Sequence, residues 1–283
     1  MKLTFWGVRG VAPAPGPATV RYGGNTACVE VRSTSGALTI LDAGTGLIPL
    51  GRMLTNERLD ATLLLSHTHW DHIHGFPFFA PIFLPQNRLT IFGPGRSSEA
   101  LEGILAGQLA GHFSPIYALK NLSAQIVVRV VDATPFEAGG LRIQAVELPH
   151  GKTSALAFRL QENGSVCAYL PDAGYRTEPS EAAVECCHRA DILIHDATYS
   201  PEDFEKYSRR GFASVEHAVA MAMRAEVKRL VLFHYSEEYS DGFLDALGER
   251  ARLLLDQAGG KSIELVAARE GSTIEVPAAI TGR

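Results

Sequence analysis

Four side chains that can bind metal ions are concentrated in one short stretch of the sequence. His67, His69, Asp71 and His72 fall within six positions, directly after an apolar run that indicates a buried strand. His67 and His69 alternate, so an extended backbone points both to the same side. Asp71 and His72 follow where the chain is expected to turn into a helix. This His-x-His-x-Asp-His pattern can supply two ligands to each of two metal ions, whereas so many polar groups would make a poor core.

Three further residues that can bind metal follow strand-like runs later in the chain, namely His150, Asp172 and His234. With HTHWDH they form an ordered set of motifs that resembles the metallo-β-lactamase superfamily from Phe5 to about Ala267. The segments FWGVRG, RYGGNTACVEV, LDAGTG and GFPFF are similar to the phosphodiesterase branch of that superfamily. RNase Z and the phosphoribosyl cyclic-phosphate phosphodiesterases belong to this branch.

The resemblance implies an α/β fold, a four-layer αββα sandwich, with a dinuclear metal centre. Its ligands would be His67, His69 and His150 on one metal, Asp71, His72 and His234 on the other, and Asp172 as the bridge. Imidazole and carboxylate ligands without a thiolate suit Zn²⁺, with Mn²⁺ or Fe²⁺ as alternatives. The two ions would share a water, lower its pKa and make it the nucleophile. Asp42, in the Asp-x-Gly turn, is expected to support a ligand rather than to bind metal.

The sequence departs from the resembled family at the group that would protonate the leaving group. RNase Z-like relatives have a G-H-S-T motif whose histidine pairs with the acid of an H-E-A-T stretch. This chain keeps the second motif at residues 195–198, but the first reads GFAS, with Phe212 in place of the histidine. We therefore do not expect tRNA 3′ processing. The candidate catalytic residues are Asp71, Asp172, His195 and His217, with structural roles as the alternative for the two histidines.

Candidate substrate contacts come from loops. Arg9 and Arg21 lie in a Gly/Pro-rich segment and could reach an anionic substrate or simply be solvated. Residues 107–124, which carry His112, interrupt the alternation of strands and helices and are either a substrate lid or a surface connection. The apolar residues 76–85 are expected to form a wall of the site.

Hydrophobic periodicity predicts the elements that would position these residues. The expected strands span 2–5, 28–32, 38–41, 63–65, 89–92, 125–131, 141–148, 154–160, 166–170, 191–194, 229–233 and 263–267. The expected helices span 47–54, 180–189, 214–225 and 241–257, and a further one is capped by Ser97. Periodicity alone does not distinguish the αββα sandwich from other α/β folds.

Length, net charge and cysteine spacing limit the classes of protein to which this chain can belong. The chain has 283 residues, 46% of them hydrophobic, which is ample for one large domain over residues 1–283. The formal net charge of -5 gives no global basic field for a polyanion such as tRNA. The four cysteines lack disulfide-like or Cys-x-x-Cys spacing, and neither a signal peptide nor a membrane span is evident, so a cytoplasmic protein is expected.

We expect a dinuclear metal-dependent phosphodiesterase that cleaves small cyclic phosphates or cyclic nucleotides. A carboxylic ester or lactone hydrolase on the same metals is the alternative enzyme, and a non-catalytic metal-binding sensor is the alternative outside enzymes. The resemblance also makes a homodimer a reasonable expectation.

Overall fold

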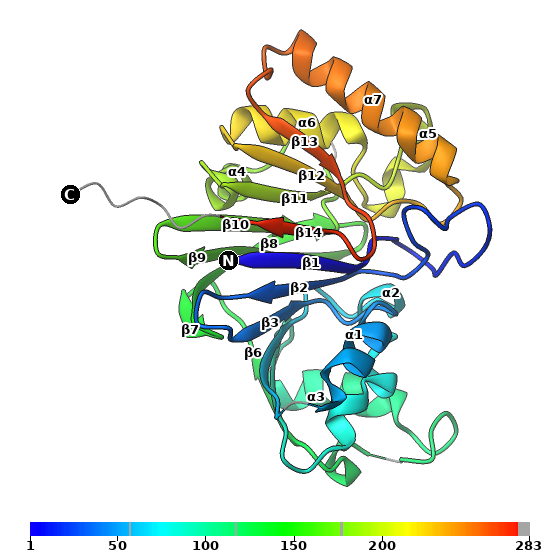
Figure 1. Cartoon of the computed structure of the whole chain (residues 1–283), viewed down its shortest axis with the longest axis vertical. Helices are drawn as coiled ribbons and strands as arrows, with labels where there is room; N and C mark the ends of the chain where they lie inside the picture. The colour runs from blue at the N-terminus through cyan, green and yellow to red at the C-terminus, as the bar shows by residue number, and fades with distance from the viewer. Residues whose placement is uncertain (57, 117, 176–177, 277–283) are drawn as a thin grey trace.

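The computed structural model describes residues 1–56, 58–116, 118–175 and 178–276. The described residues form two seven-stranded sheets that stack face to face and are covered by helices on their outer sides (Figure 1). This αββα arrangement confirms the expected fold. Tyr117, within the expected lid segment, lies outside the described residues.

The first sheet combines antiparallel strands from the start and end of the chain with four parallel strands. Its order is β14 (Thr273–Glu275), β1 (Lys2–Gly7), β2 (Cys28–Arg32), β3 (Leu38–Leu41), β4 (Asp60–Leu64), β5 (Arg88–Gly93) and β6 (Gln125–Val130). The strands from β3 to β6 run parallel. Its helices are α1 (Leu47–Met53), α2 (Trp70–Ile73) and α3 (Ser98–Gln108), below the sheets in Figure 1.

The second sheet repeats this division in the later part of the chain. Its order is β13 (Glu264–Ala267), β12 (Arg229–Phe233), β11 (Ile192–Asp196), β10 (Ser165–Leu170), β9 (Thr153–Glu162), β8 (Leu141–His150) and β7 (Phe136–Ala138). The strands from β10 to β13 run parallel. Its helices, at the top of Figure 1, are α4 (Glu181–Cys187), α5 (Pro201–Tyr207), α6 (Val215–Arg224) and α7 (Asp241–Gln257).

Short 3₁₀ helices occupy the connections. They are η1 (Leu54–Asn56), η2 (Phe76–Phe78), η3 (Ala80–Phe83), η4 (Leu119–Asn121) and η5 (Ser208–Arg210). The prolines in η2 and η3 occupy early helical positions, where a missing N–H costs nothing, and Pro81 is also buried. No helix within the described ranges has the length and apolar character required to cross a bilayer.

Two buried clusters hold the layers together. The larger one fills the space between the sheets and continues beneath α4, α6 and α7, and the smaller one lies between the first sheet and helices α1 and α3. In α7 the buried residues Leu244, Leu247, Ala251 and Leu255 recur every three or four positions, so one stripe faces the core. This packing fixes the strands whose ends carry the candidate site.

Most expected elements are present with end shifts of a few residues. Ser97 accepts a hydrogen bond from the Ala100 N–H and caps α3 as expected. The strands β7 and β14 and the helix α5 were not expected; the two strands have three residues each, which is too short for a period to emerge. The described part of residues 107–124 contains turns and η4, so the lid stays a prediction.

Candidate metal centre

The predicted ligands lie at one edge of the sandwich, where strands from both sheets end. In chain order they follow β4 (His67, His69), lie in α2 (Asp71, His72), end β8 (His150), follow β10 (Asp172) and follow β12 (His234). The carboxyl ends of parallel strands are where open α/β sheets place their sites. Rigid strands therefore bring residues as far apart as His67 and His234 to one place.

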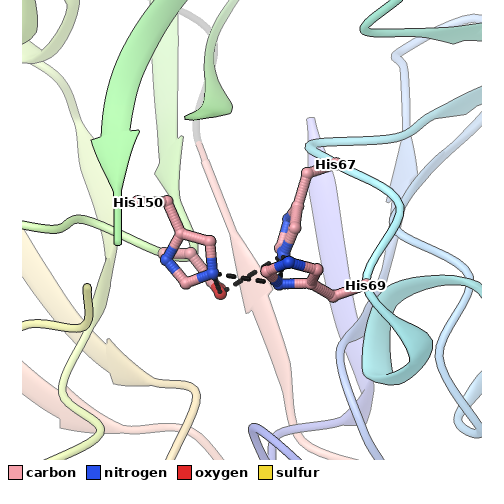
Figure 2. Close-up of side chains that lie close together, drawn as sticks. His67, His69 and His150 are labelled. Carbon is pink, nitrogen blue, oxygen red and sulfur yellow. Dashed lines mark hydrogen bonds and ion pairs between the residues drawn. The ribbon is translucent and has the colours of Figure 1, made fainter. Parts of the chain in front are cut away.

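The first group consists of three histidines around one carboxylate oxygen. His69 Nδ1 lies 2.9 Å from His67 Nε2 and 3.0 Å from His150 Nε2. Asp172 Oδ2 lies 3.5 Å from His67 Nε2 and 3.4 Å from His150 Nε2. Figure 2 shows the three rings with their nitrogens turned toward one another.

The second group contains Asp71, His72 and His234. The two Nε2 atoms of the histidines are 3.1 Å apart, and Asp71 Oδ2 lies 3.4 Å from His72 Nε2 and 3.3 Å from His234 Nε2. Asp172 Oδ1 is 3.2 Å from His72 Nε2 and 3.1 Å from His234 Nε2. Asp172 thus presents one oxygen to each group, as the bridging prediction requires.

The nitrogen and oxygen atoms of this cluster are arranged for binding metal ions rather than for hydrogen bonds with one another. Both carboxylate oxygens of Asp172 are buried and lack a hydrogen-bond partner among the described residues. A buried carboxylate without hydrogen bonds destabilises the folded state unless it is paired with a charge or coordinates a metal. The ligand atoms within each group lie within 4.8 Å of one another. Imidazole nitrogens and carboxylate oxygens converging in this way fit divalent metal ions.

The charges of the cluster depend on one another. Burial raises the pKa of Asp172, but the rings of His234, His72 and His67 outweigh burial and lower it below its usual range. Burial also lowers the pKa of His72, but the carboxylates of Asp172, Asp71 and Asp42 outweigh it and hold the pKa well above 6.5. Positive charge therefore stabilises this site, whether protons or metal ions supply it.

Asp42 supports a ligand, as expected. Its carboxylate accepts hydrogen bonds from His72 Nδ1 at 2.8 Å, the Tyr169 hydroxyl at 2.7 Å, and both the N–H and the hydroxyl of Ser66. The bond to Nδ1 leaves Nε2 of His72 free to face the site. Asp42 follows β3 with a left-handed φ of 58°, and His234 has a φ of 60°, so strained backbone is held on both sides of the site.

A second set of contacts orients the ligands of the other sheet. His150 Nδ1 donates to the Gly211 carbonyl at 2.7 Å. His234 Nδ1 lies 2.9 Å from Thr198 Oγ1, whose hydroxyl donates to Asp196 Oδ1 at 2.6 Å. These contacts again direct each Nε2 toward the site.

Asp196 also joins three loops at this edge. Its carboxylate accepts hydrogen bonds from the backbone N–H groups of Ala173, Thr198 and Ala213. Ala173 follows the bridging ligand Asp172 directly, so the carboxylate fixes the segment that carries the bridge. Asp196 therefore has structural partners even though the family histidine is absent.

Phe212 lies against the ligands, at the place where the family histidine was expected. Its ring centroid is 5.1 Å from that of His150 and 5.6 Å from that of His234. On its other side it contacts Tyr199 edge-to-face. An apolar wall therefore borders the centre on this side.

The structure does not support the catalytic roles considered for two other histidines. His195 is fully buried; its Nδ1 donates to the Asp196 carbonyl, its Nε2 accepts from the Tyr175 hydroxyl, and burial lowers its pKa to about 4. His217 Nδ1 accepts from the Ser214 N–H and caps α6, with its ring against Phe204. His195 is structural because both of its nitrogens have partners within the fold. For His217 this holds for Nδ1 alone, so its catalytic role stays a prediction.

The structure corrects one of the expected substrate contacts, Arg9, and leaves those of Arg21 and His112 as predictions. Arg9 is buried and its guanidinium donates to the carbonyls of Gly23, Ser236 and Tyr239, so it stabilises loops instead of meeting a substrate. Arg21 donates to the Asp245 carboxylate at the surface. His112 is exposed in the 107–124 segment, and no contact of its side chain with the ligands is found among the described residues.

The sequence reasoning gave no role at the site to two cations that lie beside the candidate metal centre. A cavity of about 460 Å³ is lined by residues that flank the ligands, among them Pro149, Lys152, Gly174 and Arg209. No carboxylate is found among its described lining residues, and Lys152 and Arg209 form no ion pair with any described residue. The position of Lys152, two residues after His150, was the signal available in the sequence.

Comparison with known proteins agrees with this geometry. A family model described as the beta-lactamase superfamily domain matches residues 39–235. The chain belongs to this superfamily, and it is a metal-dependent hydrolase.

Individual proteins are similar to this chain at lower sequence identity. Ribonuclease BN of Escherichia coli is 28% identical over 254 residues, covering 74% of this chain and 81% of that protein. YhfI of Bacillus subtilis, a metallo-β-lactamase fold protein, superposes with a TM-score of 0.72 and 21% identity over 97% of this chain and 98% of that chain. A diphosphatase of the PhnP family gives a TM-score of 0.68 with 20% identity over 98% of each chain. The two structures share the fold of this chain.

Proposed function

We propose that this chain is a phosphodiesterase with two divalent metal ions, Zn²⁺ in the first place, that hydrolyses small cyclic phosphates or cyclic nucleotides. His67, His69 and His150 would hold one ion, Asp71, His72 and His234 the other, and Asp172 both. When bound, such ions supply Lewis acidity and lower the pKa of water.

The cationic cavity beside His150 is the observation that carries this proposal. A phosphodiester has a negative charge, whereas a lactone or carboxylic ester is neutral. Lys152 and Arg209 would bind the phosphate oxygens with charge-assisted hydrogen bonds, and no described carboxylate in the lining opposes them. A neighbour in fold, the diphosphatase of the PhnP family, is named for cleaving a diphosphate, which supports a substrate with a phosphate group here.

Other residues around the centre orient the ligand rings and exclude water. Asp42 and Thr198 hold the rings of His72 and His234 with Nε2 facing the site. Phe212 excludes water from one side but cannot donate a proton. A strained cyclic phosphate, which expels its leaving oxygen more readily than an open diester, is the substrate that suits a site without this donor. A 3′-extended tRNA, which the name Ribonuclease BN would suggest, suits neither the net charge of -5 nor Phe212.

Metal content and a substrate panel test this function. The protein is assayed for metals by elemental analysis and then incubated with 2′,3′- and 3′,5′-cyclic nucleotides, bis-p-nitrophenyl phosphate, a lactone and a tRNA precursor. We expect about two metals per chain and metal-dependent cleavage of the cyclic phosphates. Faster turnover of the lactone would replace the proposal with the carboxylic ester class, and full metal occupancy without any hydrolysis would replace it with a sensor.

Two variants test the cavity itself. Lys152→Ala and Arg209→Ala should each raise KM for phosphodiesters about 10-fold, the loss expected for one charge-assisted hydrogen bond, with metal content unchanged. Lys228→Ala is the matched control, because Lys228 pairs with Asp191 ahead of β12, at the edge of the sheet away from His234. An unchanged KM in both cavity variants would contradict the assigned phosphate contact.

A further inference from the structure

A second and larger cavity lies on the outer side of α2. Its volume is about 790 Å³, which is within the range of small-molecule sites. Its walls come from α1, the segment with η2 and η3, and the 108–116 part of the expected lid. Its lining includes the side chains of Arg52, Trp70, Phe78, Gln108 and Phe113.

This cavity is separated from the metal centre by the thickness of one helical turn. Trp70 and His74 are both exposed, with ring centroids 5.6 Å apart, and both line the cavity. Asp71 and His72, between them in the sequence, are buried and belong to the metal centre. One face of this helical turn therefore borders the metal centre, and the other face lines the cavity.

The walls are aromatic and exposed. Trp70 is 65% exposed, Phe78 is 59% exposed and Phe113 is 82% exposed. Large apolar side chains gathered in one hollow of a soluble protein mark a binding surface. Flat rings favour a flat ligand, which they can contact face to face or edge to face.

Polar groups in the same cavity lack partners. Gln108, the last residue of α3, is only 8% exposed, and its amide oxygen and nitrogen are both buried without a partner among the described residues. Arg52 forms no ion pair with any described residue, and no described carboxylate lines the cavity. The unpaired Gln108 carboxamide fits a ligand group that both donates and accepts hydrogen bonds. Arg52, without a carboxylate partner, fits an anionic ligand group.

We propose that this cavity binds a planar aromatic heterocycle that carries an anionic group, as a nucleotide does. The ring lies against Trp70 and Phe113, its polar edge pairs with the Gln108 carboxamide, and its phosphate meets Arg52. The carboxamide can pair with a base edge through one donor and one acceptor. The ligand is a separate effector and not the substrate, because its phosphate meets Arg52 and not the metal centre; this site does not depend on the proposed reaction.

Fluorescence of Trp70 tests binding without any need for turnover. Trp6 is the other tryptophan of the chain and is bonded to Glu30 in the first sheet, so Trp6→Phe leaves Trp70 as the reporter. We expect adenosine 5′-monophosphate to quench or blue-shift the Trp70 emission of the metal-loaded protein with saturation. Adenosine should bind at least 10-fold more weakly, and ribose 5-phosphate should leave the emission unchanged. Equal responses to all three compounds would overturn the proposal.

Variants separate this cavity from the metal centre. Gln108→Leu should keep the melting temperature or raise it, since it removes an unsatisfied amide, yet weaken binding at least 10-fold; Arg52→Gln should weaken binding similarly. Arg88→Gln, at the exposed start of β5, is the matched control, and Lys152→Ala should leave the titration unchanged. Loss of binding in Lys152→Ala, or a blue shift that depends on protein concentration alone, would overturn the proposal in favour of the metal centre or a second copy.

Inhibition kinetics test whether the ligand is an effector. A change in kcat without competition against bis-p-nitrophenyl phosphate, lost in Gln108→Leu, supports the effector site. Simple competition by adenosine 5′-monophosphate, or a kinetic effect that persists unchanged in Gln108→Leu, would overturn it in favour of binding at the metal centre.

Discussion

Asp172 is the residue on which the two halves of the metal centre depend. Its oxygens face His67 and His150 on one side and His72 and His234 on the other, at 3.1–3.5 Å. Both oxygens are otherwise unpartnered among the described residues. No other ligand in the described part of the chain contacts both groups in this way, so removing it should affect both ions.

Asp172→Ala should therefore abolish turnover and lower the metal content. Without the bridging carboxylate, the four histidines lose the charge that draws a cation between them. Elemental analysis and the cyclic phosphate assay measure both effects. Asp256→Ala, on the exposed face of α7, is the control, and a fully metallated, active Asp172→Ala would contradict the bridging role.

Phe212→His tests the missing proton donor. Because Phe212 lies against His150 and His234, a histidine there would stand beside the reacting group. We expect kcat to rise by 10-fold or more for poor leaving groups such as alkoxides, a typical contribution of general acid catalysis, and little for p-nitrophenolate. Phe212→Leu controls for the change of shape; an equal response to both leaving groups would mean that protonation is handled elsewhere.

At the scale of elements, the site depends on loops that follow strands, and Asp196 at the end of β11 joins three of them. The His150 and His234 rings are fixed from the same region, through Gly211 and Thr198. The elements of the second sheet therefore determine where its ligands point.

Asp196→Ala should lower the free energy of unfolding by about 3 kcal/mol, because three buried backbone N–H groups lose their acceptor. Urea denaturation measures this change. Asp132→Ala, which removes an exposed carboxylate bonded to Thr134 N–H, should cost less than about 1 kcal/mol. A similar small loss in both variants would show that Asp196 does not hold the loops.

His195 should make stability depend on pH. Its pKa is lowered from 6.5 to about 4 by burial, so between these values the unfolded chain binds a proton that the folded chain excludes. Its contribution is therefore present above pH 6.5 and is lost as the pH falls toward 4, by roughly 3 kcal/mol in all. Urea titrations at pH 7 and pH 5 should show a smaller loss in His195→Gln than in the parent; identical losses would refute this assignment.

At the scale of the whole molecule, the metal centre connects the two sheets. The ligands His67, His69, Asp71 and His72 belong to the first sheet and its helix, whereas His150, Asp172 and His234 belong to the second. Bound ions would therefore link halves that otherwise meet through the apolar core between the sheets.

Chelation should lower the melting temperature, and added Zn²⁺ should restore it. Ligand at 100 times its dissociation constant stabilises a folded protein by about 2.7 kcal/mol, provided that the unfolded chain does not bind it. Differential scanning calorimetry with and without chelator measures the shift. A melting temperature unaffected by complete metal removal would show that the core alone joins the sheets.

The sequence by itself determined the parts of this protein that are local. The His-x-His-x-Asp-His pattern and the strand-like runs before His150, Asp172 and His234 predicted the elements and the candidate ligands that the structure brings together, because alternation and strand ends are encoded within a few residues. Fold class also followed, with the family resemblance supplying the sandwich.

Tertiary structure alone decided the surroundings of those ligands. Arg9 is buried because carbonyls of Ser236 and Tyr239, 227 and 230 residues away in the chain, surround its guanidinium. Gln108 and Trp70 share one cavity, and Lys152 and Arg209 share another, through packing between distant elements. The burial of a side chain and its hydrogen-bond partners depend on contacts between residues far apart in the chain. Periodicity within one segment carries no information about these contacts.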